Sequence, residues 1–565
     1  MNVILASNRP TVSTGSISTD PLVALPDFPA SWNSLGGALW SVSKRAATRV
    51  AMWDSTGASL TYSELLVRAC VLWRALSRRL TAAENVGILM PPLVPSAVAN
   101  LALNLGGRVP VNLNYTAGAE AVNSAIRQAG ITHVVTARKA TDRLGFVPDA
   151  EPIWLEDLPA TITTIDKAWG FFVSKLGAGL ASWFLPGLRG NRLDRLATII
   201  FTSGSTGDPK GVMLSHRNIL SNVMAVGCHL DFHDDDKLLG VLPFFHSMGT
   251  TICLWMALVL GIPVVFHSDP RDARVIGDLI ERHELTILLG TPTFMRMYLT
   301  RCKPPQLKSL RYLILGAEKL KPELERDIRE KLGITPLEGY GCTELSPVVS
   351  VNTPFEVTAP DGRTIPGNRV GTVGRPIPGT AVRTIHPETG EPLPPGTEGL
   401  VLVKGPQVMM GYLNKPEETA AVLKEGWYNT GDLGLLDADG FLKINDRLSR
   451  FSKIAGEMVP HVKVESAIMA VTGRNEQQVA VTGVLDHKRG EKLVVLYVPA
   501  SDDAEHPVPP LEPEVVVKAI REAGLPNLWV PDPADFFEID HLPTLGSGKI
   551  DLKALKQIAR SKAGI

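Results

Sequence analysis

A stretch near residue 200 joins a buried strand to a loop of glycines and hydroxyls. Leu196–Phe201 is an almost continuous apolar run, which has the length and type of a buried strand. Small residues follow it at once, and Pro209 precedes a lysine. Glycines let a backbone approach an anion closely, while hydroxyls add hydrogen-bond donors. The pattern predicts a phosphate-binding loop, and its expected contacts are Thr202, Ser203, Gly204, Ser205, Thr206, Gly207 and Lys210.

This loop does not fit the phosphate loop of P-loop NTPases. Their pattern, G-x-x-x-x-G-K-[ST], requires a glycine five residues after Gly204, and this chain has Pro209 there. The plain alternative is a Ser/Gly-rich surface loop. It leaves unexplained why a strand lies on one side and Pro-Lys-Gly on the other, so we favour the phosphate-binding interpretation.

Length and composition exclude several classes of function. A chain of 565 residues is too long for one core and indicates at least two domains. The 57 basic and 58 acidic residues nearly balance, so no nucleic-acid partner is expected. Five cysteines without a C-x-x-C pair indicate neither a disulfide framework nor a zinc site, which fits the cytoplasm. Residues 1–27 lack the order of a signal peptide and are predicted to be a flexible arm.

The order of apolar runs predicts an α/β fold. Strand-like Val86–Met90, helix-like Ser96–Leu105 and strand-like Val109–Leu113 follow one another, which favours parallel pairing. The run Ile131–Val135 continues the pattern. Beyond Pro387, Pro/Gly-rich turns separate short strands and indicate a β-rich part. We therefore predict a large N-terminal domain of several subdomains over residues 28–448, with mostly parallel sheets and a β-rich subdomain, and a small mobile α/β domain over 449–565.

The stretch T-S-G-S-T-G-D-P-K-G resembles the phosphate loop of the acyl-adenylate-forming, or AMP-binding, superfamily. Leu242–Gly249 resembles the family segment whose histidine, here His246, borders the carboxylate substrate. Relatives that activate amino acids carry aspartate there, so His246 implies a carboxylic acid without an α-amine. The plain alternative is that His246 is an ordinary core or surface histidine.

Two further motifs imply the nucleotide contacts. Gly316, Ala317 and Glu318 follow a strand where the family's backbone borders adenine. Glu338–Glu344 matches G-Y-G-x-T-E, so the resemblance places Tyr340 on adenine and Thr343 on the α-phosphate. It also implies that Glu344, with Thr202, holds Mg²⁺, and hard oxygen ligands suit that ion.

The C-terminal motifs complete the resemblance, which covers about residues 32–565. Y-x-T-G-D implies that Asp432 contacts ribose, Arg447 fits the family's ribose-contacting arginine, and Lys453 keeps the family's later spacing. The hinge position carries Ser449, where relatives have Asp or Lys. The loop ending at Lys549 resembles the catalytic-lysine loop, in which a cation stabilises the charge of a carboxylate attacking the α-phosphorus.

The resemblance implies ATP-dependent activation of a fatty acid and transfer to a phosphopantetheine thiol, with ATP and Mg²⁺ as cofactors. Three stretches, 316–320, 450–459 and 545–549, look like the acyl-acyl-carrier-protein synthetase half of a bifunctional acyltransferase, which favours acyl carrier protein over CoA as the partner. A non-catalytic nucleotide-binding module is disfavoured by the intact Thr343, Glu344 and Lys549. A luciferase-like oxidase would need the same adenylate and stays open.

Residues 168–188 are almost wholly apolar. At helical spacing, one face would carry an aromatic stripe, and its members are Trp169, Phe172, Leu176, Leu180 and Trp183. Lys175, four glycines and Pro186 argue against a membrane-spanning helix. Two interpretations remain, a helix packed on the domain surface or peripheral contact with a membrane.

Overall fold

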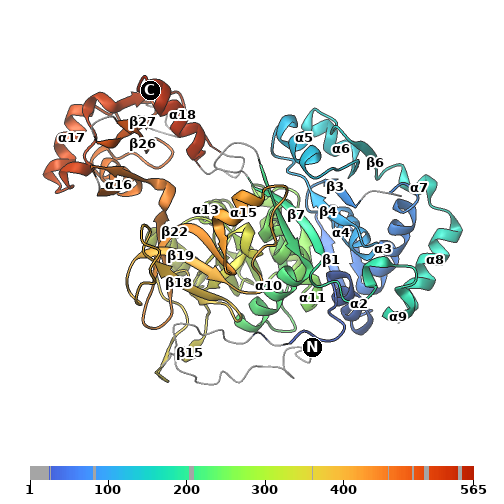
Figure 1. The fold of residues 1–565 in the computed structure, drawn as a ribbon. Helices are drawn as coiled ribbons and strands as arrows, with labels where there is room; N and C mark the ends of the chain where they lie inside the picture. Colours follow the sequence, from blue (N-terminus) through green and yellow to red (C-terminus); the bar gives the residue numbers. More distant parts are fainter. Residues whose placement is uncertain are drawn as a thin grey trace. The chain divides into compact units, whose positions relative to one another are not determined.

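The described residues form two compact units (Figure 1). The larger unit runs to Thr430 and includes Leu435–Lys443; the smaller contains Gly431–Gly434 and Ile444–Ile565. The chain therefore passes between the units within strands β22 (Trp427–Leu436) and β23 (Leu442–Arg447). The predicted domain boundary at residues 448 and 449 stays a prediction. The residues that this computed structural model describes are 25, 27–80, 84–202, 209–358, 361–455, 457–486, 489–501, 508–544 and 550–565.

A mostly parallel sheet organises the larger unit. Within the described chain it has nine strands, in the order β17-β14-β13-β12-β11-β9-β10-β1-β2. Neighbours from β13 to β1 run parallel, and the pairings at both ends are antiparallel. The bounds are β1 (Val50–Asp54), β2 (Ser59–Thr61), β9 (Leu238–Gly240), β10 (Val264–Phe266), β11 (Ile287–Gly290), β12 (Tyr312–Leu315), β13 (Leu337–Gly341), β14 (Val348–Val351) and β17 (Arg375–Pro376).

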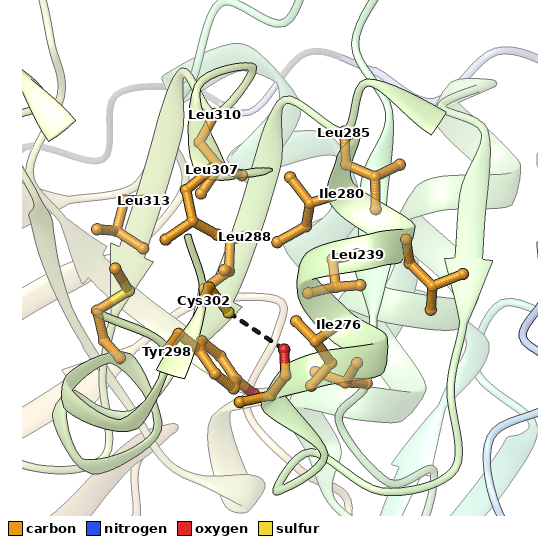
Figure 2. Packing of buried hydrophobic residues seen from close by; sticks show 14 of the residues in the cluster. Leu239, Ile276, Ile280, Leu285, Leu288, Tyr298, Cys302, Leu307, Leu310 and Leu313 are labelled. Carbon is orange, nitrogen blue, oxygen red and sulfur yellow. Dashed lines mark hydrogen bonds between the residues drawn. The ribbon is translucent and has the colours of Figure 1, made fainter. Parts of the chain in front are cut away.

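Helices cover both faces of this sheet. On one face lie α12 (Ala273–His283), α13 (Pro292–Arg301) and α14 (Pro322–Leu332), whose apolar side chains pack on β9 to β12. Figure 2 shows this core, in which the Cys302 thiol donates to the Ala273 carbonyl at 3.1 Å. The π-helix η2 (Met248–Met256) contacts β9 and also packs against α10 (His216–His229). The buried strands thus form a rigid base for the loops at their ends.

A second parallel sheet has the order β4-β3-β5-β6. Its strands are β3 (Asn85–Leu89), β4 (Val109–Asn112), β5 (His133–Thr136) and β6 (Glu151–Trp154). Helix α4 (Val94–Leu105) connects β3 to β4, and α5 (Ala119–Gln128) connects β4 to β5. The strand–helix–strand pattern predicted for residues 86–113 is therefore confirmed, as is the α/β class.

Antiparallel strands supply the β-rich part of this unit. The predicted strand before the phosphate loop is β7 (Leu196–Thr202), which pairs with β8 (Lys210–Ser215). Another sheet has the order β18-β19-β22-β21, with β18 (Ala381–Ile385) and β19 (Gly399–Lys404) as a hairpin and β21 (Leu423–Lys424) paired with β22. A short strand, β20 (Gly411–Tyr412), pairs with β8.

The continuous helix predicted for residues 168–188 is wrong. The structure has α8 (Thr164–Lys175), α9 (Ala178–Ala181) and a 3₁₀ turn over Pro186–Leu188. Helix α8 ends because Leu176 is extended, and Gly177 then caps the start of α9. Since the helix stops there, the predicted stripe does not form one face.

The smaller unit is a compact α/β domain. Within its described residues, the sheet order is β25-β24-β27-β26, with β28 (Phe536–Glu538) parallel to β27. Helices α16 (His461–Thr472) and α17 (Pro513–Glu522) bury one core against it, and α18 (Leu552–Lys562) buries a second. The four strands are β24 (Phe451–Ile454), β25 (Glu457–Pro460), β26 (Val479–Asp486) and β27 (Gly490–Tyr497).

Candidate active site

The carboxyl ends of the parallel strands bring most predicted site segments of the larger unit to one edge. Strand β9 lies between β10 and β11 in the sheet. The chain passes from β9 to β10 on one side of it, and the next connection crosses from β10 to β11 on the other side. Such a switch point opens a crevice at the carboxyl ends of the strands, where α/β proteins bind ligands. The segment with His246 follows β9, Gly316–Glu318 follows β12, and Cys342–Glu344 follows β13. Of these three strands the sequence predicts only β12, and it does not predict this shared edge.

A hydroxyl contact joins the predicted carboxylate segment to the predicted phosphate segment. Ser247 Oγ lies 3.3 Å from Thr343 Oγ1, although the residues are 96 positions apart. The neighbouring His246 is exposed, and its ring centroid lies 4.6 Å from that of Phe245. Phe245 in turn packs edge-on against Tyr115, with the ring centroids 4.8 Å apart. Aromatic packing thus braces the segment in which His246 precedes Ser247, the residue that contacts Thr343.

Two carboxylates hold the predicted adenine loop, one within the loop and one on β13. Glu318 Oε2 accepts from the Thr293 hydroxyl at 2.6 Å and from its amide at 3.2 Å, which fixes the loop after β12 to the first turn of α13. Glu338 accepts from the Leu320 amide at 3.2 Å, and burial raises the pKa of this carboxyl. Ala317 has φ of 68°, a left-handed conformation that costs a non-glycine residue about 1 kcal/mol. The backbone of Gly316–Glu318 is therefore held in a defined shape.

A chain of two tyrosines orients the Glu344 carboxylate. Tyr412 donates its hydroxyl to Glu344 Oε1 at 2.8 Å. Tyr428 hydrogen-bonds to Tyr412 in turn, and burial raises the pKa of both phenols. The Glu344 carbonyl also accepts from the Met409 amide at 2.8 Å. Both the backbone and the side chain of Glu344 are thus fixed by residues distant in sequence.

Close packing also sets the path of the loop that follows β13. A Cβ added at Gly341 would lie 1.9 Å from the carbonyl oxygen of Pro347, so only glycine fits there. The three residues after Gly341, including Thr343 and Glu344, are half-buried. Tyr340 is half-buried as well, which leaves part of its ring for a planar ligand. Its predicted stacking on adenine stays a prediction.

The phosphate-loop prediction lies mostly outside the described residues. Ser203, Gly204, Ser205, Thr206 and Gly207 all belong to that undescribed part.

The two ends of that loop are described. Thr202 ends β7 and Lys210 begins β8, and they are register partners. Lys210 Nζ lies 2.6 Å from Glu418 Oε2 and over the Tyr412 ring, 5.0 Å from its centroid. An incoming phosphate would have to replace Glu418 as the partner of this ammonium.

The predicted ribose contacts belong to the smaller unit. Arg447 Nε donates to Asp432 Oδ1 at 2.9 Å; Asp432 is buried and Arg447 is exposed. Lys453 is exposed on β24, and its amide donates to Glu491 Oε2 at 2.8 Å. Lys549 lies outside the described residues. The roles assigned to these four residues stay predictions.

Comparison with known proteins decides the family. A model for "AMP-binding enzyme" matches residues 39–413, well over half of the chain. The chain belongs to the AMP-binding enzyme family. It is 36% identical over 367 residues to the long-chain-fatty-acid–CoA ligase of Bacillus subtilis, covering 63% of this chain and 60% of that one. It is 29% identical over 505 residues to the feruloyl-CoA synthase of an Amycolatopsis species, covering 87% and 93%.

Solved structures agree with this assignment. ATP-bound MatB from Rhodopseudomonas palustris superimposes with a TM-score of 0.75 at 26% identity, over 93% of this chain and 98% of that one. The o-succinylbenzoate CoA synthetase of Bacillus subtilis, solved with an acyl-adenylate, has a TM-score of 0.73 at 24% identity, over 92% and 97%. The second likeness concerns the fold. The predicted adenylate-forming fold is therefore confirmed for this AMP-binding enzyme.

The donor set fits the family's cofactors, ATP and Mg²⁺. Mg²⁺ in nucleotide sites is held by one or two carboxylates together with substrate phosphates. The Glu344 carboxylate, with one oxygen held by Tyr412, matches that demand, and Thr202 could add a hydroxyl. Among the described residues, no group of three or more His, Cys, Asp or Glu could hold a metal. Such an ion would therefore depend on the nucleotide for much of its coordination.

Proposed function

We propose that this AMP-binding enzyme activates a fatty acid with ATP and transfers the acyl group to the thiol of CoA. The fatty-acid carboxylate attacks the α-phosphorus, pyrophosphate leaves, and acyl-AMP forms. The thiol sulfur then attacks the acyl carbonyl, and AMP leaves as the carbon–oxygen bond to phosphate breaks. Relatives named as long-chain-fatty-acid–CoA ligases support this choice of acid and thiol.

One contact carries the first half-reaction. Because Ser247 Oγ lies 3.3 Å from Thr343 Oγ1, the segment assigned to the acid and the segment assigned to the α-phosphate meet. A carboxylate bordering His246 would lie near a phosphate bordering Thr343. Holding the two reactants together in this way accounts for a large part of the rate enhancement expected of such an enzyme.

The residues bordering the acid side are apolar or aromatic. Phe244 and Phe245 are buried, Tyr115 packs against Phe245, and η2 beyond them is buried throughout Gly249–Met256. Position 246 carries a histidine and not a carboxylate that could pair with the α-ammonium of an amino-acid substrate. This environment suits an acyl chain better than an amino acid.

Acyl carrier protein is the second candidate acceptor, and the sequence resemblance over 450–459 favours it. Carrier proteins are acidic, so a basic docking face is expected, and the candidate members in this chain are Lys453, Lys463, Lys488 and Arg489. Lys488 lies outside the described residues. The other three are exposed, but Glu491 accepts from the Lys453 amide and places a negative charge beside that residue. The relatives named as CoA ligases lend no support to the carrier.

Paired acceptor assays test this proposal. ATP–pyrophosphate exchange is first measured over saturated acids of increasing length, with ferulate and malonate as non-fatty acids. The best acid is then offered with CoA or with holo acyl carrier protein at low and high salt. We expect exchange with long-chain acids and thioester formation with CoA. Exchange confined to ferulate or malonate would refute the fatty acid, and salt-sensitive transfer to carrier protein without transfer to CoA would refute the CoA assignment.

A further inference from the structure

Exposed aromatic residues gather on one small part of the larger unit. Within the described chain, fifteen large hydrophobic residues are exposed, and six of them fall between residues 165 and 184. Ile165 and Trp183 are the most open, at 75% and 77%. We call these six residues the aromatic patch; its members are Ile165, Phe171, Phe172, Leu180, Trp183 and Phe184. Such a concentration marks an interaction surface, because single exposed apolar residues are normally scattered.

The packing of α8 explains why its bulky side chains face outward. The helix contacts α3 (Tyr62–Leu76), and α8 and α9 lie on the outer side of α3 (Figure 1). Its buried residues near the contact are small: Gly170, Val173 and Ser174. A Cβ added at Gly170 would lie 2.4 Å from Val71 Cγ2 and 3.0 Å from the Val71 amide. An ordinary surface helix buries its large apolar residues, and here the small face is buried instead.

Hydrogen bonds fix α8 in this orientation. Thr163 and Asp166 form a capping box at its start, and Arg78, which follows the end of α3, binds Asp166 with both terminal nitrogens of its guanidinium, at 2.9 and 3.2 Å. The Arg74 guanidinium lies over the Trp169 ring, 5.0 Å from its centroid, and Lys44 donates to the Ser174 carbonyl. The outward display of the patch is therefore part of the fold.

The exposed charges within the segment that carries the aromatic patch have one sign. Between residues 164 and 189 the chain carries Lys167, Lys175 and Arg189, all exposed. The single acidic residue there, Asp166, is buried and ion-paired to Arg78. A surface helix that joins aromatic side chains to lysines and arginines matches the boundary of an anionic bilayer, where rings enter the headgroup region and cations meet phosphates. The described helices include none long and apolar enough to cross a membrane.

We propose that the aromatic patch docks this enzyme on the surface of an anionic lipid bilayer. The observation behind it is the coincidence of six exposed apolar side chains with three exposed cations on elements that the fold holds rigidly. A second copy of the chain is the other conceivable occupant, but two identical faces would oppose cation to cation. The inference concerns binding alone and stands whatever acid the enzyme activates.

Sedimentation with sucrose-loaded vesicles tests the proposal on the full chain. We expect binding to vesicles of phosphatidylcholine with a quarter phosphatidylglycerol. Phe172→Ser with Trp183→Ser should weaken this binding at least about tenfold, because two rings no longer enter the interface. The matched control, Phe355→Ser with Val370→Ser, changes exposed apolar residues elsewhere on the same unit and should bind normally. Absence of wild-type binding, or equal binding by the patch variant, would overturn the proposal.

Two further experiments distinguish docking on a membrane from pairing with a second copy of the chain. One is a charge-reversal variant, and the other is fluorescence quenching by brominated lipids. Lys167→Glu with Lys175→Glu should weaken binding to the anionic vesicles about fivefold or more per lysine. Binding to vesicles of pure phosphatidylcholine should be unaffected. Brominated lipids should quench wild-type fluorescence more than that of Trp183→Phe, which keeps an aromatic ring. Equal quenching would count against the docking site. Ultracentrifugation gives a second test. A wild-type dimer that becomes a monomer in the Phe172→Ser, Trp183→Ser variant would also count against the docking site, because a second copy would then cover the patch.

Discussion

At the scale of single residues, the hydroxyl of Tyr412 is the closest described partner of the predicted Mg²⁺ ligand. Its bond to Glu344 Oε1 measures 2.8 Å and directs the other carboxylate oxygen elsewhere. Partners that orient a metal-binding carboxylate typically change metal affinity about 10- to 100-fold when removed. Tyr412 is in this sense a positioning residue.

Tyr412→Phe should raise the Mg²⁺ concentration required for half-maximal pyrophosphate exchange about tenfold. The maximal rate at saturating Mg²⁺ should fall much less, because the phenyl ring keeps the packing. Tyr428→Phe removes only the next bond in the chain and serves as the milder comparison. An unchanged Mg²⁺ requirement in Tyr412→Phe would show that Glu344 does not hold the ion, or holds it without this support.

Lys549 is assigned its role from the sequence, and kinetics can test it directly. Lys549→Ala should slow acyl-adenylate formation by about 10²- to 10³-fold, the scale for losing one preorganised charge-stabilising donor. Thiolysis of chemically supplied acyl-adenylate should be largely retained, since the carboxylate no longer approaches a phosphate in that step. Lys562→Ala, on the exposed end of α18, is the matched control. Equal loss in both half-reactions would remove Lys549 from adenylation.

At the scale of elements, a buried ion pair ties the start of the smaller unit to its core. Arg450 binds Glu465 Oε2, and Glu465 Oε1 accepts from the Val481 amide of β26 at 2.7 Å. Burial raises the pKa of Glu465 to about 7, against the attraction of Arg450, which lowers it. Because the folded pKa lies above the ordinary value of 4.5, this group favours folding most below about pH 4.5, and its contribution falls as the pH rises through 7.

Arg450→Ala should destabilise the smaller unit more at pH 8 than at pH 6. Without the guanidinium the pKa of Glu465 rises further. The loss of stability relative to the wild type therefore grows with pH, because Glu465 must ionise while it is buried. Removing one partner of such a pair costs about 3 kcal/mol or more. Hydrogen exchange of β26 and β27 measures this when variant and wild type are compared at each pH. The double variant with Glu465→Gln should lose the pH dependence, and a deficit equal at both pH values would contradict the account.

The strands and helices near the site were predictable because their signals are local. Apolar runs predicted β7, β12 and the β3–α4–β4 unit. The single helix predicted for residues 168–188 is interrupted because the backbone is extended at Leu176, and the exposure of its large apolar side chains has a separate cause. Periodicity marks large apolar residues as buried, but Gly170 allows α8 to approach Val71 so closely that the small face is buried instead.

The partners of the site residues could not be predicted from sequence. Tyr412 stands 68 positions from Glu344, and Thr293 stands 25 from Glu318, and no local pattern marks either. Their pairing depends on β20 joining β8 and on β11 lying beside β12. The motif residues themselves carried a signal because the resemblance specifies them by type and order.

At the scale of the whole molecule, the chain passes from one unit to the other close to Ser449. The 3₁₀ turn Leu448–Arg450 begins after Arg447, and the smaller unit starts at Ile444. Two half-reactions need different groups at the same phosphate and acyl carbon, so a rotation between the units is expected to exchange Lys549 for the incoming thiol. The backbone around residue 449 would absorb that rotation.

Ser449→Pro should therefore separate the two half-reactions. Proline fixes φ near about −65°, which suits the 3₁₀ turn already present but blocks a change to another conformation. Pyrophosphate exchange should stay near the wild-type rate, and thioester formation from supplied adenylate should fall by about tenfold or more. Ser449→Ala, which leaves φ free, should behave as wild type in both assays. If the proline variant forms thioester as fast as the alanine variant, residue 449 is not where the chain turns, because fixing its φ would then leave the second half-reaction unaffected.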